Sequence, residues 1–162
     1  MKGVDALIAT VLILAISIAA IALALQLGKP GLDRNQEILI FQEAKANLIA
    51  FDAAIKEVVS QGNGSTRVVD TSVTGGEYSI DSTAENIVFA MQSKAQIVGE
   101  GISNIESGVN VTGYLEEVRL RADYAYNILE SSKFGAGKRR IVIRNEGFDA
   151  SAGKQLLSIR VT

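Results

Sequence analysis

The stretch ALIATVLILAISIAAIALAL, residues 6–25, decides the architecture of this chain. Within it only Thr10 and Ser17 are not apolar, and no charged residue occurs from residue 6 to residue 28. As a helix, those 23 residues would span about 34 Å, which exceeds the roughly 30 Å hydrocarbon core of a bilayer. Because such a helix is apolar on every side, it must be covered by lipid or by other protein.

Residue types alone leave two interpretations of this apolar segment open. It is either a transmembrane anchor or a secretory signal cleaved after Ala24, because Ala22, Leu23 and Ala24 fit a small-x-small cleavage site. The apolar run is longer than the roughly 7–15 residues of a secretory signal, and Lys2 is the one basic residue before it. The sequence therefore favours the anchor over a signal whose mature protein would begin at Leu25.

A third interpretation comes from the residues that begin the chain. The start KGVDALIATVLILA, residues 2–15, resembles the N-termini of archaeal type IV pilins and archaellins. Their class III signal peptide is a short basic leader that ends in Gly before a long apolar helix. The resemblance implies that a prepilin peptidase cleaves between Gly3 and Val4. Asp5 and Ala6 stand where the family often has Ser and Pro. The Asp5 carboxylate would either pair with the new amine of Val4 or of a neighbour, or lie as a polar residue at the membrane edge.

The same resemblance implies a function. The protein would be a structural subunit of an archaeal surface filament for adhesion or motility. It would be inserted in the cytoplasmic membrane first, and the pilus assembly machinery would then build it into an extracellular helical homopolymer with a surface or cell target for adhesion. The expected filament core consists of Leu7, Ile8, Leu12, Ala15, Ile16, Ala19 and Leu23. The alternative is a membrane-anchored extracellular β-domain, or minor pilin, that does not itself form the filament.

Beyond the apolar segment the sequence predicts an α+β fold. We expect a leader at 1–3, a hydrophobic helix at 4–28, an amphipathic helix at 29–61 and a β-rich head at 62–162. Pro30 predicts a kink or short unwound stretch, because proline lacks a backbone donor and disfavours helix in the preceding residue. Asp33 with Gln36 three residues later resembles a capping box and predicts a new helix start.

One apolar seam defines the second helix. Residues three and four apart lie on one helix face, and the seam consists of Phe41, Ala44, Leu48, Phe51, Ile55 and Val58. Gly62 is a natural C-terminal cap, so the helix is predicted to end at Gln61.

The remaining hundred residues change to a period of two, which is typical of half-buried strands. This alternation predicts strands at 66–73, 109–112, 139–145 and 155–161, and a hairpin that joins 77–81 to 86–91. Several short strands at such spacing favour a β-sandwich or a rolled sheet. Residues 116–129 fit two templates, because Val118, Leu120 and Ala122 alternate with charged residues while Leu115, Val118 and Leu129 also align on a helix. We expect a strand, with helix as the alternative.

Composition excludes several kinds of chemistry. The chain has no His, Cys or Trp and a net charge of −2. Zinc, haem and iron–sulfur sites therefore lack their usual ligands, and the commonest general base is missing. Near-neutral charge argues against nucleic-acid binding. No catalytic residue, metal site or cofactor is expected, and the protein is not expected to be an enzyme.

Two kinds of surface feature remain. Asn63 and Asn110 each begin an N-glycosylation sequon, and Asn63 is the better candidate because glycines flank it in an expected loop. The main basic concentration consists of Lys133, Lys138, Arg139, Arg140 and Arg144. It is either a solvated hairpin tip or a contact for an acidic stretch of another subunit, such as Glu116 with Glu117.

Overall fold

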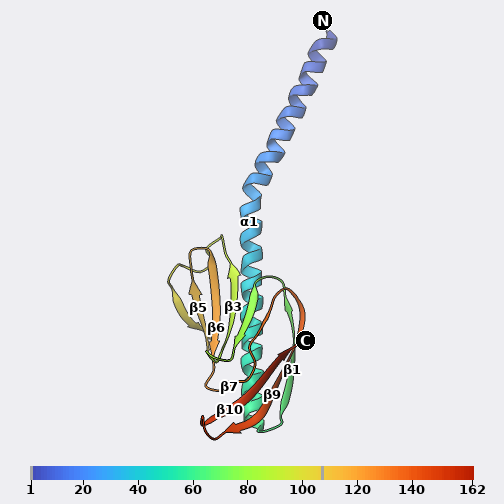
Figure 1. Cartoon of the computed structure of the whole chain (residues 1–162). Coiled ribbons are helices and arrows are strands. Elements are labelled where there is room, and N and C mark those ends of the chain that lie inside the picture. The colour runs from blue at the N-terminus through green and yellow to red at the C-terminus, as the bar shows by residue number, and fades with distance from the viewer. Residues whose placement is uncertain (1, 107) are drawn as a thin grey trace. The chain divides into compact units, whose positions relative to one another are not determined.

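The protein is an α+β molecule with one long N-terminal helix and a β-rich head, as the sequence predicts. A computed structural model describes residues 2–106 and 108–162, with the side chains of residues 2–7 and 103–106 outside that description. The chain divides into two compact units, Met1–Gln36 and Glu37–Thr162. Figure 1 shows helix α1, which runs from Lys2 to Gln61 and belongs in part to each unit.

Helix α1 passes through Pro30 without interruption. The predicted unwound stretch is therefore wrong, and so is the predicted helix start at Asp33, which lies inside α1. Proline costs a helix interior about 3 kcal/mol, mainly through one lost hydrogen bond and a clash with the preceding turn. The turns around Pro30 are exposed, so water can reach the carbonyl that proline leaves without its helical donor.

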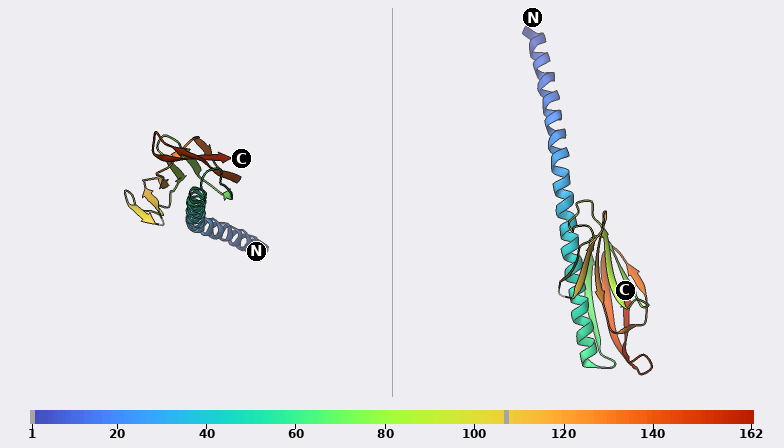
Figure 2. Two further views of the ribbon diagram at one scale, coloured as in Figure 1. Left: turned by 90° about the horizontal axis from the view of Figure 1, so that it is seen from below. Right: turned by 90° about the vertical axis from the view of Figure 1, so that its left-hand side faces the viewer.

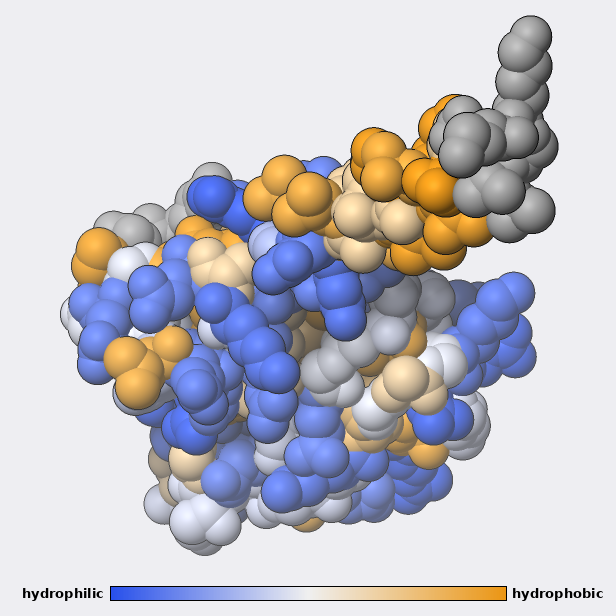
Figure 3. Space-filling view, turned by 90° about the horizontal axis from the view of Figure 1, so that it is seen from above, coloured by the Kyte–Doolittle hydropathy of each residue, from blue (hydrophilic) through white to orange (hydrophobic). Residues whose placement is uncertain are grey.

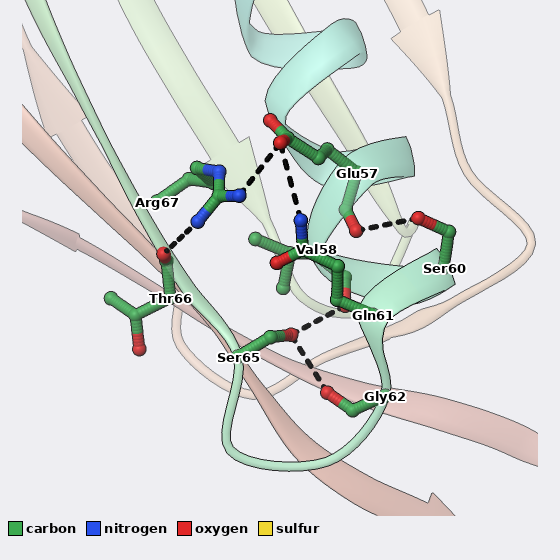
Figure 4. Close-up of polar contacts among 8 residues, drawn as sticks. All are labelled: Glu57, Val58, Ser60, Gln61, Gly62, Ser65, Thr66 and Arg67. Carbon is green, nitrogen blue, oxygen red and sulfur yellow. Dashed lines mark hydrogen bonds and ion pairs between the residues drawn. The ribbon is translucent and has the colours of Figure 1, made fainter.

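The C-terminal end of α1 matches the prediction. Gly62 adopts the left-handed conformation, with φ 85°, and its amide donates to the Val59 carbonyl oxygen at 3.3 Å. The Ser65 hydroxyl donates to the carbonyl oxygens of Val58 at 2.5 Å and Gly62 at 2.7 Å. Figure 4 shows the two Ser65 bonds, and the bond to Val58 satisfies a carbonyl that the last helical turn leaves without a partner.

The strands form two sheets. The first has the order β1-β9-β10-β7, and its strands are β1 (Thr66–Val73), β9 (Gly137–Asp149), β10 (Lys154–Val161) and β7 (Asn127–Ile128). The second has the order β4-β5-β6-β3-β2-β8, and its strands are β4 (Ser103–Glu106), β5 (Val109–Gly113), β6 (Glu117–Asp123), β3 (Asn86–Gln92), β2 (Glu77–Asp81) and β8 (Ser132–Phe134). All pairings within these sheets are antiparallel except β10 with β7.

The ambiguous segment 116–129 is extended and forms two strands, β6 and β7, separated by a short bend, so the helical alternative is wrong. Strand β6 covers Glu117–Asp123 and pairs with β3 and β5. The chain then crosses to the first sheet, where β7 pairs with β10. The period of two continues across that change of sheet, because Ile128 is 1% exposed while Leu129 is 46% exposed.

The head has one core, enclosed by both sheets and by the Glu37–Gln61 part of α1 (Figure 2). The predicted seam is confirmed, because Leu48, Ile55 and Val58 are fully buried and Phe41 packs against the core from a half-buried position. Tyr78 stands at the centre, with ring centroids 5.8 Å from Phe51 and 4.9 Å from Phe134. Helix and second sheet are therefore joined by aromatic packing.

Candidate functional site

The described part of the apolar segment is exposed on every side. Its large apolar side chains range from 57% exposed at Leu14 to 79% at Leu27. The helix is long and apolar enough to cross a membrane, with a mean hydropathy of 2.8 in its most apolar stretch. It is thus compatible with membrane insertion, as an anchor or as a signal. Figure 3 shows hydrophobic residues along this segment and a mostly hydrophilic surface on the head.

One face of this segment carries a shallow apolar groove. Its lining consists of Ile8, Val11, Leu12, Ala15, Ile16 and Ala19. Ala15 and Ala19 lie one turn apart, and their small side chains leave room that larger side chains border. Small residues at this spacing allow the backbones of two helices to approach closely. The Ser17 hydroxyl donates to the Ile13 carbonyl oxygen at 2.8 Å, so this polar group is satisfied inside the helix.

The structure brings most of the expected filament-core residues together. Ile8, Leu12, Ala15, Ile16 and Ala19 line the groove, whereas Leu23 is exposed outside it. The surroundings of Gly3, Val4 and Leu7, as well as those of Asp5, lie outside the described residues.

The two sequons differ in their surroundings. Asn63 is exposed between α1 and β1, and its side-chain amide lies over Gly147 of β9, whose added Cβ would be 3.5 Å from that amide. Asn110 is half-buried on β5, where its Nδ2 donates to Asp123 Oδ2 at 3.4 Å. A glycan at Asn110 would have to displace that bond, so the geometry favours Asn63.

The basic concentration is spread over the first sheet and strand β8. Arg140 Nε lies 2.8 Å from Asp70, Arg144 Nε lies 3.5 Å from Glu146, and Lys133 Nζ lies 3.8 Å from Glu77. The bond to Asp70 raises the pKa of Arg140. These basic side chains are more than half exposed, so water and salt screen the pairs and they contribute little to stability. Among the residues whose side chains the structure describes, 8–102 and 108–162, no three carboxylates converge as a metal site would require.

Sequence reasoning missed Glu37, the first residue of the head unit. Its carboxylate accepts hydrogen bonds from the Ser93 hydroxyl at 2.8 Å, the Lys94 amide at 3.2 Å and the Ala95 amide at 3.1 Å. This contact attaches the loop after β3 to α1. No local sequence signal pairs Glu37 with a loop more than fifty residues away.

Comparison with protein-family models, curated proteins and solved structures finds no match. The class of protein is therefore defined by the fold and the exposed segment: an α+β head that carries one apolar helix long enough to span a bilayer.

Proposed function

We propose that this protein is a pilin-like structural subunit of an archaeal type IV pilus-like surface filament, and not an enzyme. The observation that carries the proposal is the contrast in burial along α1. The head closes its core with the Glu37–Gln61 part of the helix, whereas the large apolar side chains from Ile8 to Leu27 are more than half exposed. Covering a segment of this kind needs lipid or other protein, and copies of the chain would supply such protein in a filament.

Polymerisation would exchange one apolar environment for another. Before assembly the segment spans the cytoplasmic membrane, and in the filament neighbouring helices replace the lipid. The groove around Ala15 and Ala19 supports close helix packing, which drives association where no water is present. Each contact would be heterologous, so identical contacts repeat without closing into a ring. The filament would lie at the cell surface, with a surface or cell target for adhesion.

The leader completes the proposal. A prepilin peptidase would cut between Gly3 and Val4 and leave the apolar segment on the mature protein. The Asp5 carboxylate would then stand beside the new amine, where opposite charges attract.

A membrane-anchored extracellular domain is the second candidate, and the same exposed segment favours it. An anchored domain retains its start, whereas a pilin begins at Val4 and a secreted domain begins at Leu25. We expect mass spectrometry of surface material, from a host with a prepilin peptidase, to find the Val4 start. Gly3→Phe should block cleavage and leave full-length protein in the membrane fraction. An intact Met1 on wild-type surface protein would reject the processing step.

A further inference from the structure

Three exposed apolar residues lie on two neighbouring loops at one end of the head. Ile102 is 49% exposed, Tyr114 47% and Leu115 61%. Backbone bonds hold their two loops side by side, because the Gly101 amide donates to the Gly113 carbonyl oxygen at 2.8 Å and the Gly113 amide donates to the Ile102 carbonyl oxygen at 3.3 Å. We refer to Ile102, Tyr114 and Leu115 as the apolar tip.

The apolar tip lies at the end of the head where the membrane-compatible segment joins it. The Ser93 amide donates to the Glu116 carbonyl oxygen at 2.9 Å, next to Leu115. The Ser93 hydroxyl in turn donates to Glu37, at which the head unit begins. Two consecutive hydrogen bonds therefore connect the tip to the point where α1 enters the head.

The short stretch of helix between the uncharged residues and the head keeps Glu37 near the bilayer. The uncharged stretch ends at Gly28, and the head begins at Glu37. Residues 28–36 extend about 14 Å as a helix, so Glu37 can be no farther than that from the end of the uncharged stretch. A head on so short a connection lies close to the headgroup layer. Membrane helices tilt by about 20° on average, and such a tilt lowers one side of the head toward the lipid.

The chemistry of the tip matches the interfacial layer of a bilayer. Tyr is enriched at that depth because its ring is apolar and its hydroxyl reaches water, while Leu and Ile add apolar area. The Tyr114 ring has the Arg119 guanidinium carbon 5.1 Å from its centroid, which orients it. Arg119 forms an ion pair with Glu117. The exposed charged residues Lys94, Glu100 and Glu116 on the neighbouring loops carry both signs. The charge around the tip gives no preference for anionic lipid.

We propose that the apolar tip inserts into the headgroup layer of the bilayer before assembly and holds the head against the membrane surface. The proposal rests on the membrane-inserted state of the proposed function. Assembly would require the tip to leave the lipid, so docking would keep the unassembled head in one defined position. The partner is the lipid surface itself, through burial of apolar area rather than through charge.

The protein has no Trp, so Tyr114→Trp introduces a single fluorescent reporter. The full chain is reconstituted in phosphatidylcholine vesicles with and without lipid brominated near the headgroup end of the acyl chain. We expect bromine to quench roughly half of the indole emission of this variant, because interfacial groups lie about 5–10 Å into that boundary. Leu115→Trp is the second reporter if the first variant misfolds.

Phe148→Trp is the matched control. Phe148 is 60% exposed on β9, next to Gly147, which contacts Asn63 beyond the far end of α1. Glu37 and Gln61 are separated by about 36 Å of helix, so the indole of the control variant should stay unquenched. Adding Leu115→Glu to Tyr114→Trp should abolish the quenching.

Equal quenching at positions 114 and 148, or none at 114, would overturn the proposal. A blue shift at 114 without bromine quenching would also overturn it and would indicate contact with a second copy instead. The measurement needs no filaments, so failure of docking leaves the filament proposal standing. Absence of filaments from the wild-type chain, with normal quenching in Tyr114→Trp, would count against polymerisation alone.

Discussion

The two parts of α1 show how one helix meets two different surroundings. From Glu37 to Gln61 the apolar residues form a single seam, and the seam is buried while Leu39 on the opposite face is 68% exposed. From residue 8 to residue 27 the apolar residues occupy every face, and all are exposed. Helix propensity is similar in both parts, so the difference lies in what must cover each surface. The head covers the first part, and the second part needs cover from outside the chain.

The largest expected effect follows from placing a charge in the uncovered part. Ala15→Asp should prevent filament formation, because a buried unpaired carboxylate costs several kcal/mol or becomes protonated. Membrane insertion should suffer less, since insertion scales give about 2.5–3.5 kcal/mol for one central Asp against many favourable residues. Electron microscopy of filaments and the abundance in the membrane fraction measure the two effects separately.

Two variants control for the charge and for the position. Ala15→Gly should cost about 1 kcal/mol of helix propensity and still allow close packing. Ala53→Asp adds the same charge at an exposed position on the head part of α1, so the head should stay folded. Normal filaments from Ala15→Asp would show that the segment is not a dry core and would favour the anchored domain.

The next largest effect is expected in the buried part of α1, where a substitution should destabilise the head. Phe51 is 1% exposed and packs against Tyr78 in the core of the head. Phe51→Ala should lower the free energy of unfolding by about 3–5 kcal/mol through lost burial and a cavity. Leu39→Ala should change it by less than about 0.5 kcal/mol, because Leu39 is exposed. Denaturant unfolding, monitored by near-UV circular dichroism, measures the free energy of unfolding of both variants. Equal losses in Phe51→Ala and Leu39→Ala would contradict a seam that is buried on one face only.

The sequence predicts the two kinds of helix surface because their information is local. An uninterrupted apolar run and a seam with spacings of three and four can each be recognised within a short stretch of chain. The end at Gly62 and most strands are predicted for the same reason. The continuous passage through Pro30 is not predicted, because local propensity is only one of the contributions that set helix boundaries.

Contacts between residues distant in sequence are the other feature that the sequence does not predict. Strand β8 has three residues, which is too short for a period to be recognised. Its strand character comes from its partner β2, which is distant in sequence. The apolar tip also depends on pairing between two loops, so the sequence shows Ile102 and Tyr114 only as separate residues.

A smaller effect is expected at the boundary between the two parts of α1. Glu37→Gln keeps the size of the side chain but removes the charge that three donors share. Hydrogen bonds to a charged group contribute about 1.5–3 kcal/mol when buried, and the loop at Glu37 is partly exposed, so we expect about 1 kcal/mol. Amide exchange at Lys94 and Ala95 should accelerate. Glu100→Gln, at an exposed position, is the control, and unchanged exchange in Glu37→Gln would exclude the attachment.

The smallest expected effect is a pH dependence at the far end of the buried part. Glu57 Oε1 accepts from Arg67 Nη2 of β1 at 2.7 Å and from Gln61 Nε2 at 3.2 Å, as Figure 4 shows. The bond to Arg67 lowers the pKa of Glu57 below its ordinary value of 4.5. Because the folded state holds the proton less tightly, this contribution to stability is present above pH 4.5 and is lost as the pH falls below it.

Comparing Glu57→Gln with the wild type isolates that contribution. The variant should lose a small part of its stability at about pH 7 and show a flatter decline between about pH 5 and about pH 3, because its side chain cannot ionise. Arg67→Gln should flatten the same part of the curve, since it removes the partner that lowers the pKa. The pair is exposed, so salt should shrink the difference. Denaturant midpoints across that pH range provide the measurement, and identical pH slopes in all three proteins would show that the Glu57–Arg67 pair does not stabilise the end of α1.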